Sequence, residues 1–144
     1  MQNIIIATHG DMAQGIKHTA EFIMGKQERL HALPAYTAEC LDFKEKLCAM
    51  IEEFSKDGEV IILTDLFGGS VNTDAMSFLG SHENVFLIAG VNLPLVIQLL
   101  VSDGGTGVKG VIRSSIEEAR EGIVFCNDLI DGADAPGSGG FDDF

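Results

Sequence analysis

The stretch IIIATHGD, residues 4–11, decides how this chain folds. Its first four residues are apolar, and three of them are β-branched, which is typical of a strand covered on both faces. Thr8 and His9 follow where that strand is expected to end, and Gly10 allows the chain to turn. The stretch therefore predicts a buried strand with a histidine at its carboxyl end.

A second stretch, VIILTDLFGGS at residues 60–70, has the same arrangement. Four apolar residues are followed by Thr64 and Asp65, and the glycine pair Gly68 and Gly69 comes before a helical pattern. This order predicts a second buried strand, which ends at a carboxylate and is followed by a glycine-lined turn into a helix.

Strands and helices are expected to alternate along the rest of the chain. Such alternation favours an α/β fold with a doubly wound, mostly parallel sheet and helices on both faces. The expected strands cover residues 2–7, 30–33, 60–64 and 85–89, with a short last strand at 122–126. The expected helices cover residues 11–24 (with Asp11 as N-cap), 38–55, 93–102 and 108–120, and a further helix begins at Ser70.

The strand order expected for this sheet is 2-1-3-4. Ligand sites in open α/β sheets lie beyond the carboxyl ends of the strands, where the strand order reverses. With the first strand between the second and the third, the ends of the first and third strands are neighbours. His9 and Asp65 are therefore expected to face each other across a small pocket.

The length of 144 residues is that of a single domain. We expect this domain to span residues 1–126. From residue 127 onward the chain is rich in aspartate and glycine and has no basic residue. Residues 127–144 are therefore predicted to be an acidic, disordered tail.

Charge and composition exclude several classes of protein. The net charge of −13 weighs against binding to nucleic acid or to anionic lipid. No apolar run is long enough to span a membrane, and no secretory signal precedes the first strand, so we expect a cytoplasmic protein. Cys40, Cys48 and Cys126 lack metal-ligand spacing and are expected to be small buried hydrophobic residues.

The pair of His9 and Asp65 suits phosphohistidine chemistry. A carboxylate that accepts the proton of one ring nitrogen fixes the imidazole tautomer and leaves the other nitrogen as a nucleophile. The backbone N–H groups of Gly68, Gly69 and Ser70 are expected to bind phosphate at a helix N-terminus, with the hydroxyls of Thr8 and Ser70 as further donors. No metal and no cofactor are expected.

Other polar residues carry less information. His18, His31 and His82 have no second ligand at metal spacing, so we interpret them as structural or exposed residues. Asn92 follows the fourth strand, where a pocket residue and a helix N-cap are equally good interpretations.

Three segments carry a resemblance to a known family: THGD after the first strand, DLFGGS after the third and IAGVNLP after the fourth. Their order and spacing resemble the mannose-family enzyme IIA of the bacterial phosphoenolpyruvate-dependent sugar phosphotransferase system. The resemblance covers about residues 2–126. It implies a phosphotransferase with a phosphohistidine intermediate, in which His9 is the phosphoacceptor and Asp65 its orienting partner.

The resemblance also implies partners. A histidine-containing phosphocarrier protein would phosphorylate His9, and the IIB component would receive the group and serve the membrane IIC/IID permease. Sugar specificity would belong to that membrane partner. Members of the family are homodimers in which the subunits exchange a short antiparallel last strand. The resemblance implies that residues 123–126 form this strand.

The loop after the third strand departs from the family pattern at two positions. The family usually has a proline directly after the serine and an asparagine two residues further on, where this chain has Val71 and Thr73. The detailed shape of the phosphate pocket is therefore expected to differ.

Alternative functions share part of this pattern. A phosphocarrier subunit of a dihydroxyacetone kinase looks like this fold, but the DLFGGS segment favours sugar transport. A receiver-like signalling module would be phosphorylated on Asp65, but it needs an acidic pair after the first strand and a lysine at the last parallel strand, and the chain lacks both. A flavodoxin-like binding protein would need a phosphate loop after the first strand, and the chain has none there.

Overall fold

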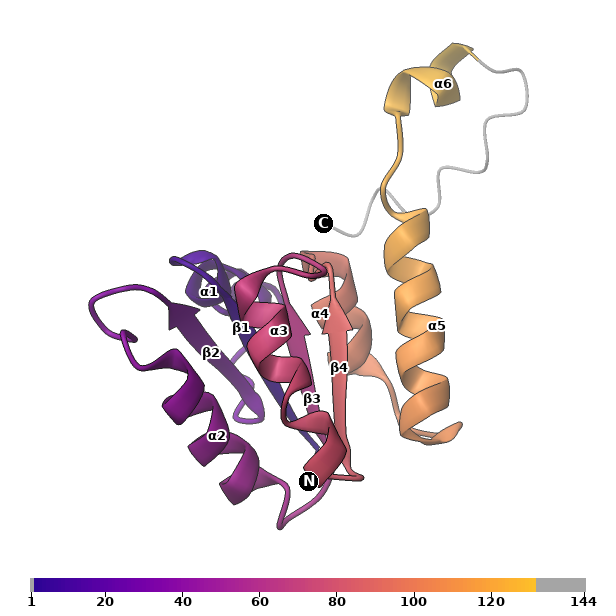
Figure 1. Ribbon diagram of the computed structural model, residues 1–144. Coiled ribbons are helices and arrows are strands. Elements are labelled where there is room, and N and C mark those ends of the chain that lie inside the picture. The colour runs from indigo at the N-terminus through magenta and orange to yellow at the C-terminus, as the bar shows by residue number, and fades with distance from the viewer. Residues whose placement is uncertain (1, 132–144) are drawn as a thin grey trace.

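The protein is built on a four-stranded parallel sheet with the strand order β2-β1-β3-β4 (Figure 1). The structure is a computed structural model, and it describes residues 2–131. The observed strand order confirms the predicted order 2-1-3-4. The elements in chain order are β1 (Asn3–His9), α1 (Met12–Met24), β2 (Leu30–Ala35), α2 (Phe43–Phe54), β3 (Val60–Thr64), α3 (Ser70–Met76), a 3-10 turn (Leu79–Ser81), β4 (Val85–Ala89), α4 (Leu93–Val101), α5 (Gly107–Glu121) and α6 (Cys126–Asp131).

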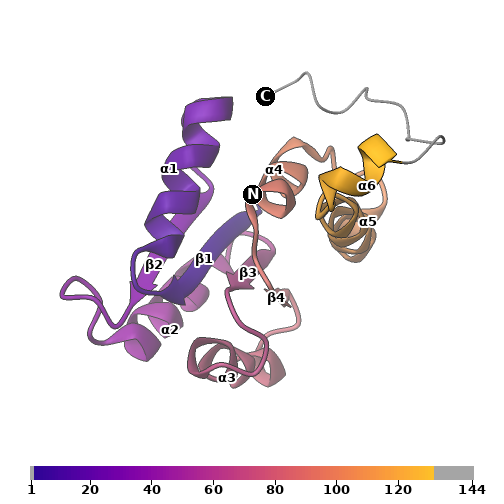
Figure 2. The same cartoon turned by 90° about the horizontal axis from the view of Figure 1, so that it is seen from above.

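Helices cover both faces of the sheet. Viewed from above, α1, α4 and α5 lie on one side of the strands, and α2 and α3 lie on the other (Figure 2). Successive residues of a strand point to opposite faces, so β1 contributes to both layers. Ile4 and Ile6 belong to the core under α1, α4 and α5, whereas Ile5 and Ala7 belong to the core under α2 and α3.

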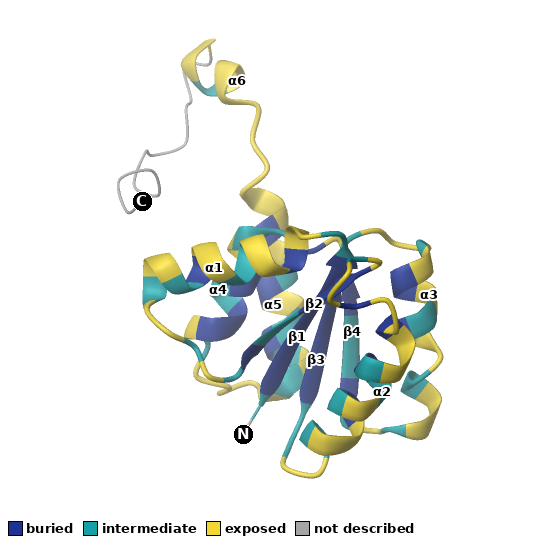
Figure 3. Ribbon diagram, turned by 90° about the vertical axis from the view of Figure 1, so that its left-hand side faces the viewer, coloured by how far each residue is buried: buried dark blue, intermediate teal, exposed yellow. Residues whose placement is uncertain are grey.

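The two central strands are almost completely buried, as Figure 3 shows. Every residue of β3 is buried, and in β1 only His9 at the carboxyl end is partly exposed. This burial accounts for the continuous apolar runs in the sequence. It also means that polar side chains reach solvent only where these strands end.

Several predicted boundaries differ from the structure; β1, for example, ends at His9 instead of residue 7. Strand β2 continues through Pro34 to Ala35, because β2 is an edge strand and proline is tolerated there. Helix α2 begins at Phe43 instead of residue 38, because residues 36–40 form a turn closed by the Tyr36 N–H, which donates to the Cys40 carbonyl oxygen at 3.1 Å.

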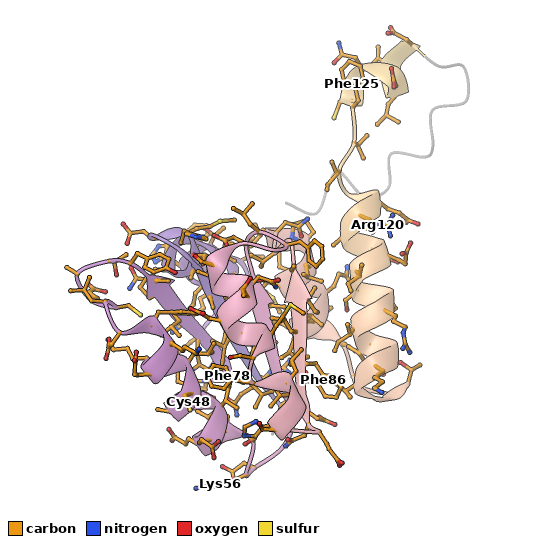
Figure 4. All side chains as sticks on the ribbon, in the orientation of Figure 1. Cys48, Lys56, Phe78, Phe86, Arg120 and Phe125 are labelled. Atoms are coloured by element: carbon orange, nitrogen blue, oxygen red, sulfur yellow. The ribbon has the colours of Figure 1, made fainter. Side chains whose placement is uncertain are left out.

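The single chain does not form the predicted last strand at 122–126. The residues after α5 have no regular structure until Cys126 begins α6. Ile123 and Phe125 are 77% and 66% exposed, and Figure 4 shows Phe125 beyond the end of α5, away from the sheet. A strand needs a neighbouring strand for its backbone hydrogen bonds, and among residues 2–131 none pairs with this segment.

The predicted tail also differs where the structure describes it. Residues 127–131 lie in α6, although the sequence predicted disorder from residue 127. The remainder of the predicted tail, residues 132–144, lies outside the described residues. Of the three cysteines that were expected to be buried, Cys40 is buried, Cys48 is only half-buried and Cys126 is exposed. Within residues 2–131, no helix has both the length and the apolar character that crossing a membrane requires.

Candidate functional site

His9 and Asp65 meet at the carboxyl ends of the two central strands. His9 is the last residue of β1, and Asp65 follows the last residue of β3. Their neighbouring strands bring the side chains together, so that His9 Nδ1 lies 2.8 Å from Asp65 Oδ2. The two side chains differ in exposure: 41% of His9 is accessible to solvent, against 10% of Asp65.

Asp65 is held as a carboxylate. Burial alone would raise its pKa, but hydrogen bonds from the backbone and the ring of His9 and from the Leu66 N–H outweigh burial and lower the pKa below its usual value. Oδ2 accepts both the backbone N–H and the ring Nδ1 of His9, each at 2.8 Å. Oδ1 accepts the Leu66 N–H at 2.9 Å.

The ionised carboxylate determines the tautomer of His9. Asp65 has no proton to donate, so the proton in their shared hydrogen bond must be on Nδ1. A neutral imidazole then has its lone pair on Nε2. An unprotonated ring nitrogen on a partly exposed side chain is a nucleophile that a second molecule can approach.

Two hydroxyl groups continue this chain of contacts on the other side of the ring. Ser70 Oγ lies 3.2 Å from His9 Nε2. The hydroxyl of Tyr36 donates to Ser70 Oγ at 2.9 Å, and the Tyr36 ring lies 5.5 Å from the imidazole between centroids. Sequence reasoning identified Ser70 but missed Tyr36. The available signal was an aromatic residue directly after β2, the strand that pairs with β1.

Thr8 has a structural position. Its side chain is completely buried, and Oγ1 accepts the Ala13 N–H at 2.8 Å. It thereby caps α1, while the expected N-cap Asp11 makes no capping hydrogen bond through its side chain. Because the side chain is completely buried, the expected contact of the Thr8 hydroxyl with phosphate is not available in this conformation.

Gly68 and Gly69 shape the loop, and the backbone N–H groups of both glycines have hydrogen-bond partners within the protein. Gly68 has φ +79°, which favours glycine, and its N–H donates to Asn72 Oδ1 at 3.2 Å. The Gly69 N–H donates to the Leu66 carbonyl oxygen at 3.1 Å. These two expected phosphate donors are therefore occupied in the structure. A Cβ atom on Gly69 would lie 3.6 Å from His9 Cε1, so the loop passes close to the imidazole.

Asn72 is a residue of the site that sequence reasoning missed. It is 2% exposed, and its Nδ2 donates to Thr64 Oγ1 at 2.9 Å. Together with its bond to Gly68, this contact ties the loop to the end of β3. The family pattern directed attention to Thr73, whose N–H makes a helical hydrogen bond to the Gly69 carbonyl oxygen at 2.8 Å. An asparagine in the first turn after a glycine pair was the available signal.

The remaining polar residues lie away from this pair or serve the fold. Asn92 caps α4, because its Oδ1 accepts the Leu95 N–H at 2.9 Å. His31 contacts Asn3 Oδ1 at 2.9 Å, and His82 Nε2 lies 3.0 Å from Glu52. Across residues 2–131, no three or more His, Cys, Asp or Glu residues are grouped so that they could hold a metal ion.

The fold and this constellation define an α/β protein with a histidine–carboxylate pair at the switch point of a doubly wound sheet. A family model described as "PTS system fructose IIA component", where PTS is the phosphotransferase system, matches residues 3–116. The chain therefore belongs to this family of sugar-specific IIA components.

Individual relatives agree with this assignment. The fructose-specific EIIA component of Bacillus subtilis (strain 168) is 26% identical over 132 residues, which are 91% of this chain and 90% of the relative. The mannose-specific EIIAB component of Escherichia coli (strain K12) is 32% identical over 124 residues, 83% of this chain. The chain covers 38% of the length of that E. coli protein.

Solved structures are similar as well. A Klebsiella pneumoniae protein described as a candidate permease of the sugar phosphotransferase system has a TM-score of 0.82 at 37% identity, with 90% of this chain and 93% of that chain covered. The IIA protein associated with the fucose utilization operon of Streptococcus pneumoniae has a TM-score of 0.78 at 27% identity, with 90% and 96% covered.

Proposed function

We propose that His9 takes a phosphoryl group from a histidine-containing phosphocarrier protein and passes it to a IIB component, which serves the IIC/IID permease. The observation that carries this proposal is the 2.8 Å contact between His9 Nδ1 and Asp65 Oδ2, which leaves the lone pair on Nε2 of a side chain that is 41% exposed. The reaction is placed in the cytoplasm, in line with the family resemblance.

The proposed step is an in-line displacement. The lone pair of Nε2 forms a bond to phosphorus, and the phosphorus–nitrogen bond of the donor's phosphohistidine breaks, so that its electron pair returns to the donor ring. The Nδ1 proton stays on His9, held by Asp65. Transfer to the IIB component repeats the exchange with His9 as the donor. Catalysis is mainly a matter of positioning and charge.

Asp65 would stabilise the reaction through charge. When Nε2 bonds to phosphorus, positive charge develops on the imidazole ring, and the adjacent carboxylate offsets it. The low pKa of Asp65, which results from hydrogen bonds that outweigh its burial, keeps this charge present at neutral pH. Ser70 Oγ, 3.2 Å from Nε2, is close enough to donate to a phosphoryl oxygen.

The surface beside His9 suits contact with another protein. Leu66 and Phe67 follow Asp65 directly and are 61% and 85% exposed. Exposed apolar side chains next to a nucleophile favour a transient protein partner, because their burial contributes to docking. The same surface would serve donor and acceptor in turn.

We further propose that the protein is a homodimer in which residues 123–126 form an antiparallel strand on the partner. Ile123, Phe125 and Ile130 are apolar and exposed in the single chain, which supports their burial against a partner subunit. Light scattering after size exclusion should give twice the monomer mass for the wild type. A wild-type monomer at micromolar concentration would contradict this assembly.

The alternative functions receive less support. A receiver module would need Asp65 free to attack phosphorus, but both of its oxygens accept N–H groups from the protein. A phosphocarrier for a dihydroxyacetone kinase would use the same histidine chemistry, but the matching family and the relatives described above are named for sugar transport.

The test is phosphorylation from labelled phosphoenolpyruvate in the presence of the general phosphotransferase proteins. The full chain should take up one phosphate that is acid-labile and alkali-stable, as phosphoramidates are. His9→Ala should take up none. His18→Ala is the matched control, since His18 is an exposed histidine on α1 outside the site, and it should be labelled like the wild type.

Two results would contradict the proposal. Undiminished labelling of His9→Ala would exclude His9 as the phosphoacceptor. An alkali-labile adduct that disappears in Asp65→Ala but persists in His9→Ala would indicate an acyl phosphate and favour the receiver interpretation.

A further inference from the structure

Tyr36 is held beside His9 by a turn with an unusual backbone. Its φ is +65°, and it is the one non-glycine residue among residues 2–131 with a positive φ. A bulky side chain rarely adopts this conformation, and it persists only where the surrounding structure fixes it. Residues held in this way concentrate at functional sites.

Three hydrogen bonds fix this turn. The Tyr36 N–H donates to the carbonyl oxygen of the buried Cys40 at 3.1 Å. The Thr37 hydroxyl donates to the Pro34 carbonyl oxygen at 2.8 Å. The carbonyl oxygen of Ala35, one residue earlier, accepts the Gly10 N–H at 2.9 Å. The end of β2 is therefore bound directly to the turn that follows His9, and Tyr36 leaves the strand at the level of the imidazole.

The hydroxyl of Tyr36 determines what the hydroxyl of Ser70 can do. A serine hydroxyl has one proton to donate and two lone pairs to accept with. Ser70 Oγ accepts the Tyr36 proton at 2.9 Å, and it lies 3.2 Å from the unprotonated Nε2 of His9. The Ser70 proton is therefore directed at Nε2. A continuous chain of donors runs from Tyr36 through Ser70 to the ring nitrogen that Asp65 leaves unprotonated.

We propose that Tyr36 is a positioning residue for phosphoryl transfer, which holds the Ser70 hydroxyl so that its proton faces the reacting nitrogen and then the phosphoryl oxygens. This inference rests on the proposed function of His9. Before transfer, the Ser70 proton lies on the lone pair of Nε2. As phosphorus approaches, this proton turns from Nε2 to a phosphoryl oxygen, so that the lone pair is free to form the nitrogen–phosphorus bond while Tyr36 keeps Ser70 in place.

Tyr36→Phe is the appropriate variant, because it removes the hydroxyl and keeps the ring that lies beside the imidazole. We expect the turnover number for transfer from the phosphocarrier protein to fall about 3- to 10-fold, the effect of losing one hydrogen bond between neutral groups. The KM for the phosphocarrier protein should stay at the wild-type value, because the ring surface is unchanged. Tyr36 is 54% exposed, so a change in KM alone would assign it to docking and overturn the proposal.

Two further variants separate the hydroxyl from the turn. Thr37→Val removes one of the three hydrogen bonds that hold the turn but leaves the Tyr36 hydroxyl in place, so it should slow transfer less than Tyr36→Phe does. A decrease equal to that of Tyr36→Phe would show that the turn, and not the Tyr36 hydroxyl, sets the rate. Tyr36→Phe combined with Ser70→Ala should be no slower than Ser70→Ala, because Tyr36 acts through Ser70. Additive losses would overturn the proposal.

The deciding experiment also measures the ¹⁵N resonances of His9 in the unphosphorylated protein. In ¹⁵N-labelled full-length protein, the Nε2 resonance of His9 should shift in the same direction in Tyr36→Phe and Ser70→Ala, and the Nδ1–H resonance should stay in place. An unshifted Nε2, or a wild-type transfer rate in Tyr36→Phe, overturns the role of Tyr36. Failure of the wild type to accept phosphate would instead refute the proposed function of His9, so the two failures are distinguishable.

Discussion

Replacement of Asp65 separates the control of the tautomer from the supply of charge. In Asp65→Asn, the amide presents one oxygen and one NH₂ group to three N–H donors. The oxygen should face His9, because two donors lie on that side and one lies on the side of Leu66. The variant therefore keeps an acceptor for Nδ1 and loses the negative charge.

The magnitude follows from the hydrogen bond to the charged group. Such a bond contributes about 1.5–3 kcal/mol, and the full effect is expected here because the Asp65 side chain is only 10% exposed. At 1.36 kcal/mol for each tenfold change, transfer through Asp65→Asn should slow about 10- to 150-fold. Asp65→Ala should be slower still, because the tautomer is no longer fixed.

Rapid-quench kinetics with the phosphorylated phosphocarrier protein measures both rates. Circular dichroism should show that each variant is folded, because Asp65 lies at a strand end outside the two hydrophobic cores. Wild-type kinetics in Asp65→Asn would refute the argument from charge. Equal rates in the two variants would show that the tautomer does not contribute.

Three further predictions concern the surroundings of the pair. Asn72→Ala should lower the free energy of unfolding in urea by about 1–3 kcal/mol, because the Thr64 hydroxyl loses a buried partner. Gly69→Ala should slow phosphoryl transfer in the rapid-quench assay, since the added Cβ would lie 3.2 Å from Leu66 Cβ, so that the loop beside the imidazole must shift. His31 should make stability depend on pH: burial, with a smaller contribution from a nearby lysine, lowers its pKa, so the folded state favours the neutral ring. Its contribution is then complete above the unfolded pKa of about 6.5 and is lost as the pH falls through the lower folded pKa, and His31→Phe should flatten the melting temperature between about pH 7.5 and 5.

Each of these predictions has an outcome that contradicts it. An unfolding midpoint of Asn72→Ala equal to that of the wild type would mean that its contacts do not hold the loop. Wild-type transfer in Gly69→Ala would show that the loop tolerates a side chain near the ring. A melting curve for His31→Phe with the same pH dependence as the wild type would assign that dependence to other groups.

The central part of the fold and of the site was predictable from the sequence. The strands at 60–64 and 85–89 match the structure, because continuous apolar runs bounded by turns have few other solutions. The contact between His9 and Asp65 follows from two polar residues at the ends of neighbouring strands. Strand order and burial together determine the positions of these two side chains.

The surroundings of the pair depend on contacts between distant segments, which a pattern along the chain does not contain. Tyr36 reaches Ser70 because β2 continues past Pro34 and a turn with positive φ follows. Thr8 looked like a phosphate ligand, but its side chain is completely buried and caps α1. The apolar segment at 122–126 has the composition of a strand, yet no strand of the described chain pairs with it.

The measurement that tests the central claim most directly is the position of phosphorus on the imidazole. In ¹⁵N-labelled protein phosphorylated from phosphoenolpyruvate, phosphorus–nitrogen coupling should appear at Nε2 of His9, and Nδ1 should keep the proton that Asp65 accepts. This result is required by the 2.8 Å contact between Nδ1 and Oδ2. Coupling to Nδ1, or phosphorus on the carboxylate of Asp65, would contradict the account.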